Sequence, residues 1–142
     1  MKTPLRYPGG KSRAVQHILP LIPEDCTELC SPFLGGGSIE LAAAERGTKG
    51  YGYDIFEPLI WFWRALLHDP EGLAKEADAL RKQDGYQYGS RGLIKEDFNR
   101  LKKELKNEKQ YSLQNAANFY ALNRSSFSGA TLSGGWSRRA SF

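Results

Sequence analysis

The sequence predicts an α/β fold that opens with a strand–helix–strand unit and continues into a mostly helical region. Short apolar stretches at residues 27–30 and 49–53 flank a helical pattern at residues 38–46. A strand, a crossover helix and a second strand in this order form a right-handed, parallel pair. Because the chain has 142 residues, we expect one domain. Within it we expect an α/β part at residues 1–68 and a helical part at residues 69–142.

The first elements follow from capping signals and hydrophobic spacing. Residues 1–10 predict an extended lead, and residues 11–22 predict a helix with apolar residues at helical spacing. After the first strand comes a glycine loop at residues 31–37. Ser38 is the expected N-cap of the next helix, and Gly47 is its expected C-cap.

The second half of the chain shows mainly helical periodicity. Residues 55–68 predict a helix rich in aromatic residues, in which we expect Trp61 and Trp63 to pack in the core. Residues 84–92 predict a loop, and from Asn123 onward the helical pattern stops. Three more helices are predicted, at residues 70–82, 94–106 and 112–122.

The charge distribution indicates a basic C-terminal segment. The net charge is +4, and no Asp or Glu follows Glu108, whereas four basic residues do. A basic, Ser/Gly-rich segment suits contact with phosphates, although a solvated tail is an equal alternative. These basic residues are Lys109, Arg124, Arg138 and Arg139.

Other function classes are disfavoured. No apolar run of about 18 residues occurs, so we expect no membrane span. The N-terminus has no apolar signal core, which predicts a cytoplasmic protein. Cys26 and Cys30 have no histidine at ligand spacing, so we expect free thiols near a buried strand rather than a zinc site.

The segment Gly10-Lys11-Ser12 looks at first like a phosphate-binding P-loop. That motif needs a glycine where Leu5 stands, and it needs a full strand before it, so we reject a nucleotide triphosphatase. What remains is a tight turn that presents backbone N–H groups and the Lys11 ammonium to a carboxylate or phosphate.

The glycine loop at residues 35–37 and Asp54 predict a site for a nucleoside-bearing cofactor. Glycines let the backbone approach a ligand closely, and an acid at a strand end accepts hydrogen bonds from ribose hydroxyls. The dinucleotide fingerprint needs glycine where Glu40 stands, and a glutamate there would repel a pyrophosphate. S-adenosylmethionine therefore fits better than NAD, and an oxidoreductase would also lack a hydride-transfer partner.

Residues 123–139 predict a contact with nucleic acid. Hydroxyl and amide side chains alternate there with arginine, phenylalanine and tryptophan. Arginine binds phosphates or guanine, and an aromatic side chain can enter a base step. The alternative is an ordinary loop that Phe127 and Trp136 hold against the core.

Together, these elements resemble the Dam-like (D12 class) DNA adenine-N6 methyltransferases. The matching segments stand in the family's order: Pro8-Gly9-Gly10-Lys11, Pro32-Phe33-Leu34-Gly35-Gly36-Gly37-Ser38, Asp54 and Asn123-Arg124-Ser125-Ser126-Phe127-Ser128-Gly129. The resemblance implies a partial Rossmann-like methyltransferase fold, with a βαβ cofactor half and a mostly helical DNA-recognition region. It also implies methyl transfer to N6 of an adenine flipped out of the duplex.

The resemblance further implies roles for individual residues. Lys11 would lie near the methionine carboxylate, and Asp54 would bind the ribose. The residues implied in holding S-adenosylmethionine are Tyr7, Gly10, Lys11, Phe33, Gly35, Gly36, Gly37, Ser38 and Asp54. Those implied in DNA contact are Arg124, Ser126, Phe127, Arg138 and Arg139.

One family element is missing from these residues. Family members carry an Asp-Pro-Pro-Tyr element that binds and orients the adenine amine, whereas this sequence has no Pro-Pro pair. We therefore assign no catalytic residue and expect an incomplete or split chain that is inactive alone. A second chain would then supply the catalytic half. The alternative is a non-catalytic DNA- or cofactor-binding remnant of the family.

Overall fold

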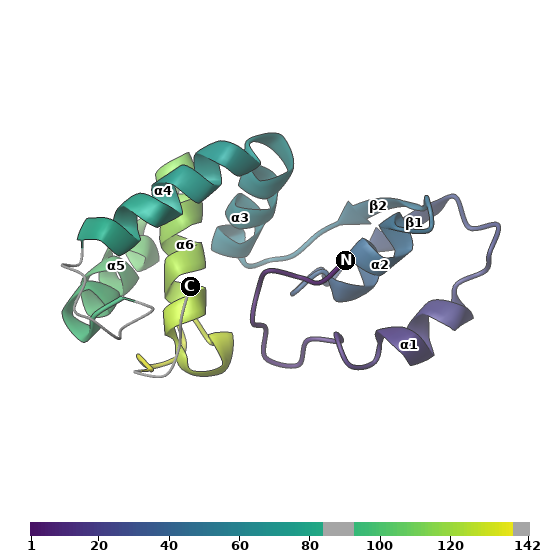
Figure 1. Ribbon diagram of the computed structural model, residues 1–142, viewed down its shortest axis with the longest axis horizontal. Coiled ribbons are helices and arrows are strands. Elements are labelled where there is room, and N and C mark those ends of the chain that lie inside the picture. Colours follow the sequence, from purple (N-terminus) through teal and green to yellow (C-terminus); the bar gives the residue numbers. More distant parts are fainter. Residues whose placement is uncertain (84–92, 138–142) are drawn as a thin grey trace. The chain divides into compact units, whose positions relative to one another are not determined.

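The computed structural model describes residues 1–83 and 93–137, and it divides the chain into two compact units (Figure 1). The first unit is Met1–Ile55, and the second begins at Phe56. The predicted loop at residues 84–92 and the Arg138-Arg139 pair lie outside the described residues. The expected boundary at residue 68 separates cofactor and recognition roles and stays a prediction.

The first unit contains the predicted strand–helix–strand arrangement. Strands β1 (Glu28–Ser31) and β2 (Lys49–Gly52) pair in parallel, with Glu28 opposite Lys49 and Ser31 opposite Gly52. Helix α2 (Ser38–Ala44) connects them and packs against both strands. The α/β character is thus confirmed for the described residues, as a sheet of two strands.

The face of this sheet that points away from α2 is exposed. This corrects the expectation of a buried strand beside the cysteines. Glu28 and Cys30 of β1 are exposed, while Leu29 and Ser31 are half-buried on the side of α2. Cys26 and Cys30 are both free thiols.

The helix predicted at residues 11–22 is much shorter than expected. Only Val15–Ile18 (α1) is α-helical, and a 3₁₀ turn, η1 (Leu19–Leu21), follows it. Pro20 has no backbone N–H, so it cannot continue the hydrogen-bond ladder of the α-helix. The tighter turn takes its place.

The capping of α2 differs from the prediction. Gly37, at φ 64°, is the N-cap, and Ser38 is instead the first helical residue. The helix ends earlier than expected, at Ala44, and its C-cap is Glu45 rather than Gly47. Gly47 lies two residues beyond that cap at φ 88°, a conformation that glycine adopts without strain.

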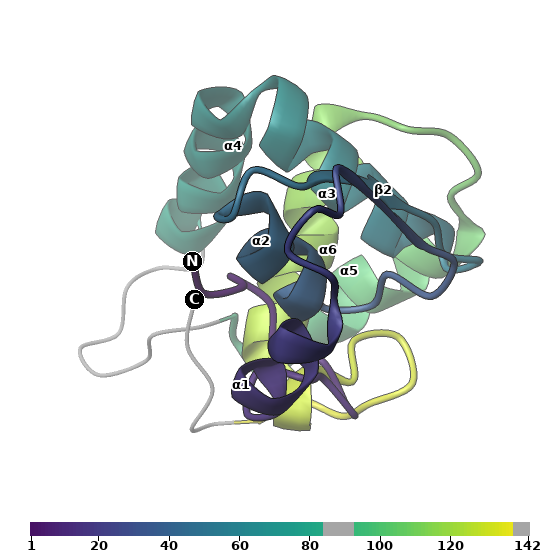
Figure 2. The same cartoon turned by 90° about the vertical axis from the view of Figure 1, so that its right-hand side faces the viewer.

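The second unit is a helical bundle. It contains α3 (Glu57–His68), α4 (Pro70–Gln83), α5 (Lys95–Asn107) and α6 (Leu113–Ser125). Helix α6 packs against each of the other three, as Figure 2 also shows. The largest apolar side chains of this core are almost completely buried: Leu59, Phe62, Phe98, Phe119 and Leu122. Trp61 and Trp63 are buried as well, which confirms their predicted packing in the core.

Helix α6 extends further than the sequence predicted. Asn123 was expected to begin an irregular segment, but the helix runs to Ser125, and Asn123 and Ser125 are both fully buried. The Asn123 side chain donates to the Gly129 carbonyl, and the Ser125 hydroxyl accepts from the Leu93 N–H. These buried hydrogen bonds replace the missing apolar periodicity. At the other end, Ser112 caps the helix by accepting a hydrogen bond from the Asn115 N–H at 3.0 Å.

None of the described helices combines the length and the apolar character needed to cross a membrane. Within residues 1–83 and 93–137, no three His, Cys, Asp or Glu side chains gather as a metal site would require.

Candidate functional site

The turn at residues 7–11 places Tyr7 and Lys11 beside the glycine loop. The Gly10 N–H donates to the Tyr7 carbonyl at 2.9 Å, and Gly9 adopts φ 73°. A Cβ on Gly10 would stand 2.9 Å from that carbonyl oxygen, so the tight turn requires glycine there. The Lys11 ammonium donates to the Gly9 carbonyl at 2.6 Å.

The glycine loop is tied to the end of β2 by two successive backbone N–H groups. The Leu34 N–H donates to the Tyr53 carbonyl at 2.8 Å, and the Gly35 N–H donates to Oδ2 of Asp54 at 3.0 Å. Gly35 adopts φ 50°, a conformation that favours glycine. The strand-end acid and the glycine loop, which the sequence paired by spacing alone, are therefore directly hydrogen-bonded.

The ring of Tyr7 lies on this loop, a contact that the sequence analysis did not foresee. A Cβ on Gly35 would stand 3.1 Å from Cε1 of Tyr7, and one on Gly36 would stand 3.0 Å from its Cβ. Burial and, to a smaller extent, the negative charge of Asp54 raise the pKa of the Tyr7 phenol. Tyr7, Gly35 and Asp54 thus form one structural unit.

This raised pKa gives a testable pH dependence. A tyrosine pKa that is higher in the folded state stabilises the fold below about pH 10, and that contribution is lost as pH rises through the folded value. We expect the difference between the phenolate absorbance titrations of wild type and Tyr7→Phe to show ionisation above about pH 10. Asp54→Asn should lower this pKa only in part, because burial is the larger cause.

Tyr53→Phe, which removes an exposed phenol, is the matched control for this titration. A Tyr7 difference titration centred at or below about pH 10 would contradict the arrangement.

Two polar contacts hold the start of α2 at the same place. Ser31 donates to Oε1 of Glu40 at 2.5 Å, and the hydroxyls of Ser12 and Ser38 are 2.8 Å apart. Glu40 therefore lies at the site and is held by the end of β1.

These segments line an open cavity of about 580 Å³. Its lining includes all but one of the residues implied in cofactor binding: Tyr7, Gly10, Lys11, Phe33, Gly35, Gly36, Gly37 and Ser38. The exception is Asp54, which is not a lining residue but is bonded to the loop at Gly35. The lining also includes residues that the sequence analysis did not assign to the site, among them Leu29, Cys30, Ser31 and Ile39.

A second candidate region follows α6. We call residues 126–136 the recognition loop. Ser126 and Trp136 form an antiparallel bridge, and the Phe127 N–H donates to the Gly135 carbonyl at 3.0 Å. The Trp136 indole donates to the Leu93 carbonyl at 2.7 Å. The loop is thus closed on itself and fixed to the start of α5.

A buried polar network shapes the recognition loop. Asn123 donates to the Gly129 carbonyl, and the Ser126 hydroxyl donates to the Asn123 carbonyl and accepts from the Thr131 N–H, each at 3.1 Å. Ser126 is fully buried, so in this structure its hydroxyl holds the loop. The sequence analysis missed this role of Asn123. An amide side chain among the apolar residues of a helix is a signal for a buried hydrogen bond, and it could have indicated this role.

The tip of the loop is exposed and its backbone is unusual. Phe127 is 71% exposed, whereas the neighbouring Ser126 is buried. Ser128 and Thr131 adopt φ 52° and 43°, which is uncommon for residues with a Cβ and rare for a β-branched one. The network over-determines this conformation and holds Phe127 outward.

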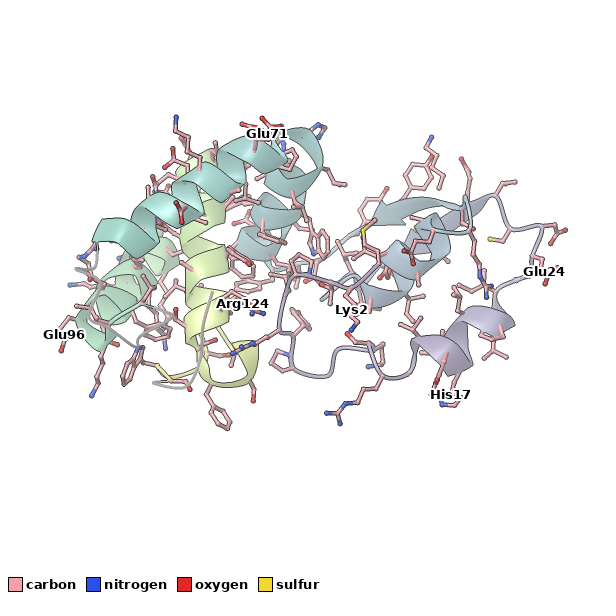
Figure 3. All side chains as sticks on the ribbon, viewed as in Figure 1. Lys2, His17, Glu24, Glu71, Glu96 and Arg124 are labelled. Carbon is pink, nitrogen blue, oxygen red and sulfur yellow. The ribbon has the colours of Figure 1, made fainter. Side chains whose placement is uncertain are left out.

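The predicted arginines are placed only in part. Arg124 lies near the C-terminal end of α6 (Figure 3) and is half-buried. Arg138 and Arg139 lie outside the described residues.

Comparison with known proteins gives one family. The model of the family described as D12 class N6 adenine-specific DNA methyltransferase matches residues 7–138, which include both candidate regions. A comparison with curated proteins found no match.

Proposed function

Because the chain belongs to the D12 class N6 adenine-specific DNA methyltransferase family, we propose that it binds S-adenosylmethionine in the first unit and DNA through the second. The observation that carries the cofactor assignment is the hydrogen bond between Gly35 and Asp54. It places a carboxylate against a glycine loop beside an open cavity, the arrangement expected for a nucleoside site.

The cavity fits this cofactor in size and chemistry. Its volume of about 580 Å³ lies within the range of about 300–1,000 Å³ typical of small-molecule sites. The Glu40 carboxylate disfavours phosphates and suits a ligand with a positive centre. We assign Asp54 to the ribose hydroxyls, Lys11 to the methionine carboxylate, and Tyr7, Phe33 and the start of α2 at Ser38 to the cavity walls. When bound, the cofactor supplies an activated methyl group.

We assign DNA contact to the recognition loop and its flanking arginines. Phe127 is exposed at the tip, where it can enter a base step, and Arg124 and the Arg138-Arg139 pair add positive charge. Ser126 would act indirectly, by holding the loop in the shape that presents Phe127.

The 142 residues contain no Asp-Pro-Pro-Tyr element to orient the adenine amine. We therefore propose that this chain supplies cofactor binding and target contact, and that the orienting residues come from outside these 142 residues. A second chain is one source for them. The same absence favours a second candidate function, a binding module without catalysis.

Two measurements on the full chain separate these candidates. Calorimetric titration should detect S-adenosylmethionine binding and much weaker binding of NAD. Transfer of a labelled methyl group to duplex DNA should require an added chain that contains Asp-Pro-Pro-Tyr. If the chain binds the cofactor but no methyl transfer occurs with any added chain, the binding module is supported. Preferential binding of NAD would refute the cofactor assignment.

A further inference from the structure

Helix α5 separates its side chains into three faces. At about 3.6 residues per turn, Phe98, Leu101 and Leu105 share one face, and all three are buried. Asp97, Arg100 and Glu104 share the second. The third holds four lysines, which we call the lysine stripe: Lys95, Lys102, Lys103 and Lys106.

Both carboxylates of the second face pair with the same arginine, which leaves that face with a net charge of −1. Arg100 forms ion pairs with Asp97 at 2.9 Å and with Glu104 at 3.5 Å. Glu96 points away from the bundle near the N-terminal end of α5 (Figure 3). Among residues 1–83 and 93–137, no carboxylate forms an ion pair with Lys95, Lys103 or Lys106, and all three are exposed. The positive charges of Lys95, Lys103 and Lys106 are therefore directed to solvent.

The lysine stripe is joined to the recognition loop. The Lys102 ammonium donates to the Gly134 carbonyl, and the neighbouring Gly135 carbonyl accepts from the Phe127 N–H. The Trp136 indole bonds to Leu93, two residues before Lys95. The returning arm of the loop thus follows the first half of α5, and the stripe continues from it along the helix.

We propose that the lysine stripe binds the phosphates of duplex DNA beside the site that the recognition loop contacts. This inference rests on the DNA contact proposed above. The distance from Lys95 to Lys106 along the helix axis is about 16 Å. That length corresponds to roughly five base-pair steps of about 3.4 Å each. A row of exposed lysines binds phosphates as point charges without reading bases.

The test compares two variants with the same change in charge. Lys95, Lys103 and Lys106 are replaced together by glutamine, and Lys102 is kept because it holds the loop. The control replaces three other exposed lysines, Lys2, Lys49 and Lys75, by glutamine in the same way. Binding of the full chain to a labelled duplex is measured by fluorescence anisotropy over a range of salt concentrations.

For the stripe variant, the slope of log affinity against log salt should fall by about 0.9 for each phosphate that is no longer neutralised, up to about 2.7 in total. The control should keep the wild-type slope. The fall should be the same on two duplexes of unrelated sequence, because the stripe reads no bases.

Each contrary outcome has a distinct meaning. If wild type binds duplex DNA and the stripe variant keeps the wild-type slope, phosphate binding by the lysine stripe is refuted. The proposed DNA contact of the recognition loop is not affected by that result. If the slope falls equally in the stripe variant and the control variant, the effect comes from net charge alone, and phosphate binding by the lysine stripe is again refuted. If wild type binds no duplex DNA, both the proposed DNA contact and phosphate binding by the lysine stripe are refuted. Calorimetric titration with S-adenosylmethionine still tests cofactor binding independently.

Discussion

Replacing Asp54 by alanine is expected to weaken S-adenosylmethionine binding by about 1.5–3 kcal/mol, or roughly 10- to 150-fold. The carboxylate is the proposed acceptor for the ribose hydroxyls, and its loss removes hydrogen bonds to a charged group. It also accepts from the Gly35 N–H, so the same change releases the glycine loop. Calorimetric titration of the full chain measures the effect.

Two further variants make this result specific. Asp54→Asn preserves the shape of the side chain but offers one acceptor oxygen instead of two, so it should also bind the cofactor less tightly than wild type. Asp25→Ala removes an exposed carboxylate from the same unit and should leave the affinity unchanged. An Asp54→Ala affinity close to that of wild type would refute the ribose assignment.

Replacing Phe119 by alanine is expected to destabilise the second unit by about 3–5 kcal/mol. Phe119 has no exposed surface, and its ring packs edge-on against Phe56 at 5.7 Å and lies tilted against Phe62 at 6.0 Å. It lies on α6, against which the other three helices pack, so the cavity left behind opens in the centre of the bundle.

The tryptophans provide a local readout of this destabilisation. All three, Trp61, Trp63 and Trp136, belong to the second unit, so urea denaturation followed by tryptophan fluorescence reports on that unit. Phe127→Ala removes the same side chain from an exposed position and should change stability by no more than about 0.5 kcal/mol. Should the alanine variant not fold at all, Phe119→Leu removes less volume and allows the comparison. Equal stabilities for the Phe119 and Phe127 variants would contradict the packing described.

Local signals predicted the strand–helix–strand arrangement of the first unit. The glycine loop, Gly47 and the spacing of the two strands are features of short segments, and each has one dominant physical cause. The distance in sequence from Gly35 to Asp54 placed the acid near the loop, and the structure adds the hydrogen bond between them. The proposed contacts of these residues with a cofactor stay predictions.

Features that depend on distant residues were not predictable in the same way. The Tyr7 ring covers Gly35 and Gly36 because a turn from the N-terminus returns to the loop. Helix α6 continues through Asn123 because buried hydrogen bonds replace apolar contacts. The family resemblance implies DNA contact for Ser126, whereas its burial follows from the way the loop closes. In each case a tertiary contact outweighed the local pattern.

The boundary between Ile55 and Phe56 has an evolutionary consequence. Every residue that lines the cavity precedes it, and the whole recognition loop follows it. With the roles proposed above, mutations that alter DNA contact can accumulate in the second unit while the proposed cofactor site stays under separate selection. With the same roles, recombination at this junction would exchange one proposed DNA-contact region for another and leave the proposed cofactor site intact.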